Sequence, residues 1–160
     1  MGQVVRYQVA KPARNNNTLN RYNDWDIRLI DFINSVRKKP FSWGVHDCLT
    51  FANNAVIAQK GTGFDSGYLS GYDDVKGAIK AYNTFLEESG YTDIIDGLDQ
   101  TFERVTGFPP RGSVVAMPVS DGAVFPYSFG IMVSKYAAFV SEEGLLMVVP
   151  DNTYLAWSIS

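Results

Sequence analysis

The sequence predicts an α+β fold in which N-terminal helices pack against a C-terminal antiparallel sheet of about five strands. Apolar residues recur at helical spacing in three segments between residues 23 and 90. After Pro110, the chain turns into short β-rich segments that are separated by turn residues. Because helices and strands are grouped and do not alternate, hairpins are expected instead of parallel β-α-β units.

The first predicted helix follows Asn23, a good N-cap, and carries Asp24 and Asp26 in its first turn, where the helix dipole favours acids. It ends at the Arg-Lys-Lys-Pro run of residues 37–40. The apolar stripe on one face predicts an amphipathic helix. It consists of Trp25, Leu29, Phe32, Ile33 and Val36.

Two further helices are predicted between residues 47 and 90. One begins at Cys48 with Asp47 as its N-cap, and Gly61 ends it. The other opens after Asp73-Asp74 and ends at Gly90, while residues 93–106 suggest a short helix that Gly97 weakens. The expected buried stripes are Cys48, Phe51, Ala52 and Ala55 in the second helix, and Val75, Ile79, Tyr82 and Leu86 in the third.

The strand predictions come from short apolar segments with turn residues between them. They are residues 112–117, 129–133, 137–140, 145–149 and 154–159.

Composition predicts one soluble domain. The chain has 160 residues, 46% of them hydrophobic and 19% charged. No apolar run approaches the roughly 20 residues that span a bilayer, so no membrane anchor is expected. One cysteine allows no internal disulfide, and one cysteine with one histidine leaves too few ligands for a zinc site. We therefore expect no metal and no cofactor.

Charge divides the chain into a basic extended arm, residues 1–22, and an acidic domain, residues 23–160. Residues 1–23 carry a charge of +4 and no acid, so a net charge of −3 leaves −7 on the remainder. The arm, in which residues 4–9 are a candidate strand, is expected to bind a partner subunit; a solvated tail is the alternative. Nucleic acid is not expected as a partner because the acidic domain repels phosphate. The basic residues are Arg6, Lys11, Arg14 and Arg21.

Cys48 is the candidate nucleophile. A cysteine in the first turn of a helix lies at the positive end of the helix dipole, which lowers its pKa and places backbone N–H groups near a developing oxyanion. Papain-like enzymes take their base from a strand across the cleft. The alternative is a small buried side chain that packs beside Phe51 and Ala55.

The segment around Cys48 carries a family resemblance. Trp43-Gly44 followed by Asp47-Cys48 at a helix start resembles the nucleophile motif of NlpC-type papain-like cysteine peptidases. Residues 24–160 more closely resemble a phage-encoded branch of that group that is found among tail genes. The resemblance implies a papain-like NlpC-type domain. Its later motifs are Gly112-Ser113-Val114-Val115 and Ala156-Trp157.

The sequence departs from the family where the catalytic histidine is expected. The resemblance places that histidine just before the Gly130-Ile131 run, where this chain has Ser128 and Phe129. Ser113 also stands where active members often have Asp. His46 is only two residues from Cys48, and such neighbours point in divergent directions at a helix start, so we do not expect it to act as the base.

These observations predict a structural component of a bacteriophage tail tip or baseplate, made in the host cytoplasm, located in the virion, and without peptidase activity. Its partners are then other phage tail proteins. The alternative is an active cysteine hydrolase of peptidoglycan peptides that aids genome entry, with Cys48 as nucleophile and Asp47 as an orienting residue. A third possibility is a host- or carbohydrate-binding module in which Trp43 and residues 61–72 line the site; the sequence identifies no small-molecule ligand.

Overall fold

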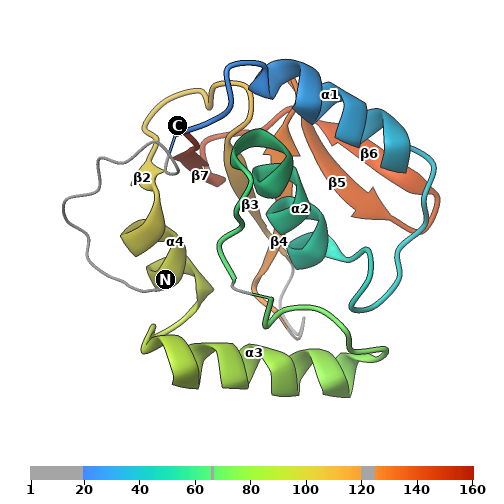
Figure 1. Ribbon diagram of the computed structural model, residues 1–160, viewed down its shortest axis with the longest axis vertical. Coiled ribbons are helices and arrows are strands. Elements are labelled where there is room, and N and C mark those ends of the chain that lie inside the picture. The colour runs from blue at the N-terminus through green and yellow to red at the C-terminus, as the bar shows by residue number, and fades with distance from the viewer. Residues whose placement is uncertain (1–19, 66, 120–124) are drawn as a thin grey trace.

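The computed structural model describes residues 20–65, 67–119 and 125–160, and the predicted strand at residues 4–9 lies outside them. Within the described residues the fold is α+β, as predicted, with helices on one side of an antiparallel sheet (Figure 1). None of the helices in these ranges is long and apolar enough to cross a membrane. The helices are α1 (Trp25–Val36), α2 (Cys48–Lys60), α3 (Val75–Ser89) and α4 (Ile94–Thr101).

Helix α1 forms where the sequence predicts it, with a different cap. Asp24, not Asn23, is the N-cap, and its carboxylate makes no side-chain cap bond. The carboxylate instead accepts a 2.7 Å bond from Arg28 Nε, because residues four apart are neighbours on a helix. The predicted apolar face is confirmed, since Leu29 and Ile33 are fully buried.

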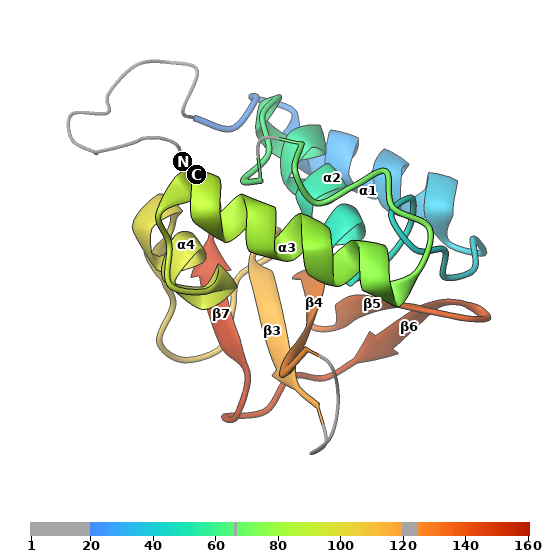
Figure 2. The same ribbon diagram turned by 90° about the horizontal axis from the view of Figure 1, so that it is seen from below.

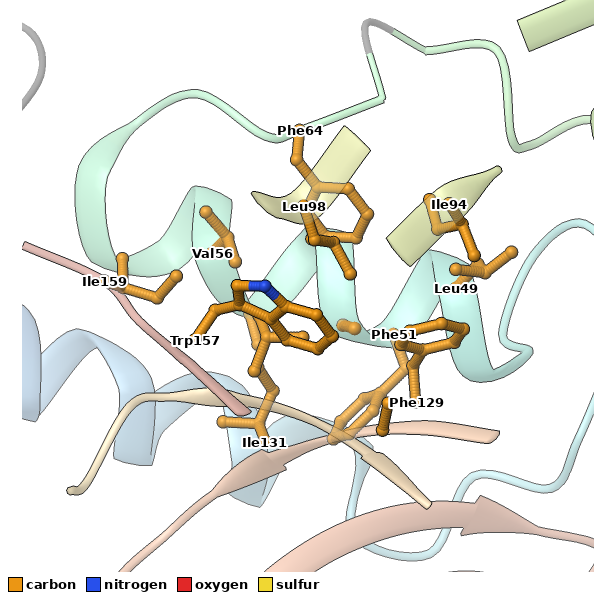
Figure 3. Packing of buried hydrophobic residues seen from close by; sticks show 14 of the residues in the cluster. Leu49, Phe51, Val56, Phe64, Ile94, Leu98, Phe129, Ile131, Trp157 and Ile159 are labelled. Carbon is orange, nitrogen blue, oxygen red and sulfur yellow. The ribbon is translucent and has the colours of Figure 1, made fainter. Parts of the chain in front are cut away.

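Helix α2 is the central helix of the domain. It begins at Cys48 and ends at Gly61, which adopts a left-handed φ of 86° and donates its N–H to the carbonyl of Ile57. Phe51, Ala52 and Ala55 of its predicted face are buried, Cys48 is partly exposed, and side chains on its other sides are buried as well. Figure 3 shows Leu49, Phe51 and Val56 of α2 in one cluster with Phe129 and Ile131 from the sheet.

Within the part of the chain that the structure describes, the sheet has six strands in the order β2-β7-β3-β4-β5-β6, and every pairing is antiparallel. All five predicted strands are present; the additional one is the two-residue edge strand β2. The strands are β2 (Glu103–Arg104), β3 (Val114–Pro118), β4 (Tyr127–Met132), β5 (Ala137–Ser141), β6 (Gly144–Val148) and β7 (Leu155–Ser158).

Successive strand residues face opposite sides of the sheet and build two apolar clusters. Val114 and Ala116 belong to the main core with the helices, whereas Val115 between them belongs to a second cluster. Ile131 pairs with Val114 and joins the main core, and the next residue, Met132, joins the second cluster. The main core holds β4 against the side of α2.

The stripe predicted for α3 is partly wrong. Val75 and Ile79 are exposed, while Ala78 and Phe85 are the buried residues. Phe85 packs against the ring of Tyr91, with centroids 5.8 Å apart. Figure 2 shows α3 as a separate layer that crosses α2 and the sheet, and the direction of this crossing decides which face of α3 is buried.

The ambiguous segment 93–106 forms α4 and then β2. A residue of α4 also binds the side chain of Trp157 in β7. Gly97 is needed within α4 because a Cβ there would lie 2.7 Å from the ring of Tyr91. Asp99 accepts a 2.8 Å bond from the buried Trp157 indole N–H and two bonds, of 2.9 and 2.8 Å, from Arg104. One carboxylate therefore links α4, β2 and β7.

Replacing Trp157 by Phe is expected to lower the free energy of unfolding by about 1–3 kcal/mol, because buried area and the indole bond to Asp99 are both lost. Chemical denaturation of the variant measures this. Arg104→Gln is the control, since the Arg104–Asp99 pair is about 40% exposed and a surface ion pair contributes little. A larger loss for Arg104→Gln than for Trp157→Phe would contradict this account.

Candidate functional site

The start of α2 is built by a capping box. The Asp47 carboxylate accepts the N–H of Thr50 at 2.9 Å, and the Thr50 hydroxyl accepts the N–H of Asp47 at 2.7 Å. These bonds satisfy two backbone N–H groups at the start of the helix, where no carbonyl of a preceding turn is available to accept them. The predicted N-cap is therefore confirmed, and it sets the residue after it, Cys48, at the first helical position.

The same carboxylate closes two loops over the helix start. Its second oxygen accepts the N–H of Gly44 at 2.9 Å and the hydroxyl of Tyr72 at 2.5 Å. Gly44 has a φ of 72°, and a Cβ on it would lie 1.9 Å from the Tyr72 carbonyl oxygen, so only glycine fits there. Gly71 in turn donates its N–H to the Gly44 carbonyl. Asp47 thus carries out a structural task with both oxygens.

The Cys48 thiol faces the start of β4. The groups near the thiol that lower its pKa are the backbone of Phe129 and Leu49 and the Ser128 side chain. The Cys48 residue as a whole is partly exposed. Its surroundings are nevertheless mostly protein, and this burial raises its pKa to about 11, with Asp47 adding to the rise. The prediction that the helix start lowers this pKa is wrong, because desolvation outweighs the hydrogen bonds.

The two residues that meet the sulfur from β4 are Ser128 and Phe129, the pair that the resemblance places at the position of the catalytic histidine. The Phe129 ring is buried in the main core, as Figure 3 shows, and its backbone is one of the groups that lower the pKa of the thiol. Ser128 presents a hydroxyl. A hydroxyl donates to a sulfur but does not take its proton near neutral pH.

His46 lies in the core. Its side chain is 2% exposed and meets the Phe51 ring edge to face at 5.8 Å. Among the described residues, Nε2 has no hydrogen-bond partner. Burial lowers the pKa of His46, Lys39 lowers it further, and Asp47 opposes both. His46 is not among the groups that act on the Cys48 thiol.

Tyr72 is the residue at this site to which sequence analysis assigns no separate role. Its bond to Asp47 joins positions 25 residues apart and depends on the path of the loop. Burial raises the pKa of Tyr72, and so do its hydrogen bond to Asp47 and its proximity to Cys48. Tyr72 is thus a neutral donor beside the thiol. Trp43, the predicted cleft wall, packs edge to face on Phe41 at 4.8 Å.

Arg21 makes contacts with other residues of the same chain. Its guanidinium lies 3.7 Å from the centre of the Trp25 ring, and it donates a 3.2 Å bond to Gln59 Oε1. Gln59 also donates to the Gly112 carbonyl at 3.0 Å. Arg21 therefore fastens the end of the arm to α2, which differs from the partner contact predicted for it. Arg6, Lys11 and Arg14 lie outside the described residues.

No cluster of three or more metal-ligating side chains occurs in residues 20–65, 67–119 and 125–160. Ser113, which stands where the resemblance expects Asp, has a buried hydroxyl without a partner in the same ranges. A buried hydroxyl with no bond is a cost to stability and supplies no charge.

Comparison with known families assigns the chain to one of them. Residues 20–159 match a family described as a domain of unknown function, DUF6950. The chain belongs to the DUF6950 family. No curated protein and no solved structure matches it. The DUF6950 match begins at residue 20, close to Arg21 and Tyr22, which contact the end of α2.

Cys48 of this DUF6950 domain is expected to react slowly with iodoacetamide at neutral pH and faster as pH rises toward about 11, because only the thiolate reacts. Alkylation rates followed by mass spectrometry measure this, and the single cysteine makes the signal unambiguous. The urea-unfolded protein is the control and should titrate near the ordinary value of about 8.5. A native rate that is already maximal at pH 7 would contradict the burial of the thiol.

Stability should fall as pH drops through the range just below the ordinary histidine pKa of about 6.5. The pKa of His46 is lowered in the folded state, so the unfolded chain binds a proton first and unfolding is favoured. One proton limits the slope to about 1.4 kcal/mol per pH unit. Denaturation at several pH values should give a flatter profile for His46→Gln; identical slopes would contradict a buried neutral imidazole.

Proposed function

We propose that the protein is a structural component of a bacteriophage tail tip or baseplate, built on a papain-like, NlpC-type fold that has no peptidase activity. The observation that carries the proposal is that Ser128 of β4 lies near the Cys48 thiol, at the position where a peptidase of this type would have an imidazole. The other candidate base, His46, is buried against Phe51.

The arrangement of elements supports the papain-like part. A cysteine at the start of a central helix, α2, lies against the second strand of the β3–β4 hairpin. The Gly-Ser-Val-Val run leads into β3, and the closing Ala-Trp is in β7 beside it. These are the elements on which the resemblance rests, in the same order.

Rate arithmetic supports the absence of peptidase activity. Because burial raises the pKa of the thiol to about 11, only a very small fraction of molecules carries the thiolate at pH 7. A positioned base contributes a further factor of about 10²–10⁴, and Ser128 cannot supply it. Turnover by this site is therefore expected to be negligible.

The assembly role rests on the phage-tail branch of the resemblance and on charge. The arm is basic and the domain acidic, a distribution that favours contact between the arm of one molecule and the body of a neighbour. The protein is then expected in purified virions at a fixed copy number per tail. Its absence from virions by mass spectrometry would contradict the assignment.

The variant Ser128→His tests the missing base directly. An imidazole at position 128 should lower the pKa of the Cys48 thiol and create measurable hydrolysis of peptidoglycan peptides, because it restores the proton acceptor opposite the sulfur. Ser128→Asn is the matched control, with similar bulk and no basic nitrogen. Hydrolysis by the unmodified protein that disappears in Cys48→Ala would instead establish the hydrolase alternative.

A further inference from the structure

The two edges of the sheet differ in how well they are protected. Edge strands that lack charges or cover tend to pair with another chain. Strand β2 at one edge has two residues, both charged. Strand β6 at the other edge reads Gly-Leu-Leu-Met-Val and carries no charge.

Apolar side chains of β6 and the next residue are open to solvent. Leu146 is 57% exposed, Met147 37% and Val149 58%. Among residues 20–65, 67–119 and 125–160, the strand is also the last in the sheet, with β5 as its only neighbour by strand order. An exposed apolar edge of this kind is suited to accept an added strand.

The backbone of β6 offers hydrogen-bonding groups on its outer side. The N–H of Leu145 donates to the Arg37 carbonyl at 2.8 Å, so it points away from β5. Because direction alternates along an antiparallel strand, the N–H and carbonyl of Met147 also point outward. The loop after α1 thus covers the first outward position of β6, and the next one is open to a partner.

The distribution of charge indicates which segment of the chain would bind to the outer edge of β6. Residues 142–151, which contain β6, carry three acids and no base, whereas residues 1–19 carry three bases and no acid. Within those first residues, Val5, Tyr7 and Val9 alternate with Val4, Arg6 and Gln8, which is the pattern of a strand with one apolar face. A proline ends strands readily, and Pro12 follows this pattern in the sequence as Pro150 follows β6.

The position at which the arm joins the domain favours binding of the arm to β6 of a neighbouring copy over binding to β6 of the same chain. Tyr22 donates its N–H to the Gln59 carbonyl at the end of α2, and Arg21 lies beside Gly112. Figure 1 shows this point on the side of β2 and β7, with β6 on the far side of the sheet. An arm that leaves one side and an open edge on the other give a head-to-tail contact between copies.

We infer that residues 4–9 of one copy add as a strand to the outer edge of β6 in a second copy. Repeated head to tail, this contact builds a ring or a filament of identical subunits. The inference concerns self-assembly and is independent of whether Cys48 is catalytic.

Sedimentation of the full chain over a range of concentrations tests the inference. Full-length protein should self-associate, and both deletion of residues 1–19 and Met147→Pro should weaken association by at least about tenfold. Proline is tolerated where the strand N–H points outward, so the pairing of β5 with β6 should be kept in Met147→Pro. Circular dichroism checks that this variant remains folded. A full-length monomer at every concentration, or association that either change leaves intact, would overturn the inference.

Engineered cysteines separate pairing between copies from pairing within one. In a Cys48→Ser background, one preparation carries Tyr7→Cys and another carries Val149→Cys. Mixing the two should give a disulfide-linked heterodimer, with Lys135→Cys in place of Val149→Cys as a control site outside β6. No heterodimer, or efficient closure within a chain that carries both cysteines, would overturn the contact between copies.

Discussion

The Asp47 carboxylate is the interaction on which the site depends. One oxygen caps α2 through Thr50, and the other holds Gly44 and Tyr72, so a single group fixes the helix start and the two loops beside it. A cap of this kind contributes about 0.5–2 kcal/mol. Here it also determines where the thiol lies, because Cys48 is the first helical residue. An acid with all its oxygens committed to structure is not available to orient a base.

Two opposing effects act on the pKa of the Cys48 thiol, and their balance decides whether the thiol ionises near neutral pH. The N-terminus of a helix and the nearby donors favour the thiolate, whereas burial and the adjacent Asp47 charge disfavour it. Burial prevails. In a peptidase an imidazolium opposite the sulfur would compensate the thiolate charge; Ser128 offers only a neutral dipole. The same fold can thus place a cysteine at a helix start without activating it, and the position of Cys48 alone does not establish a catalytic function.

Much of the fold follows from the sequence because local signals and burial agree. The Asp47-Cys48 helix start, the Gly61 and Gly90 helix ends and the five strands are all set by capping, glycine conformation and alternation. The errors arise where tertiary contacts decide. The face that α3 buries depends on how it crosses the domain, so Val75 and Ile79 are exposed despite their spacing. The pKa of Cys48 depends on how closely β4 approaches α2, and the Tyr72–Asp47 bond depends on a loop path that no local pattern encodes.

The most direct measurement of the central claim is an NMR titration of the isotope-labelled Cβ of Cys48 in the intact protein. Its chemical shift reports the ionisation of the neighbouring sulfur without a chemical probe that needs access. A thiol that is buried against Ser128 and has no base should titrate with a midpoint near a pKa of about 11. A midpoint at or below about 7, in the range of activated cysteines, would contradict the account.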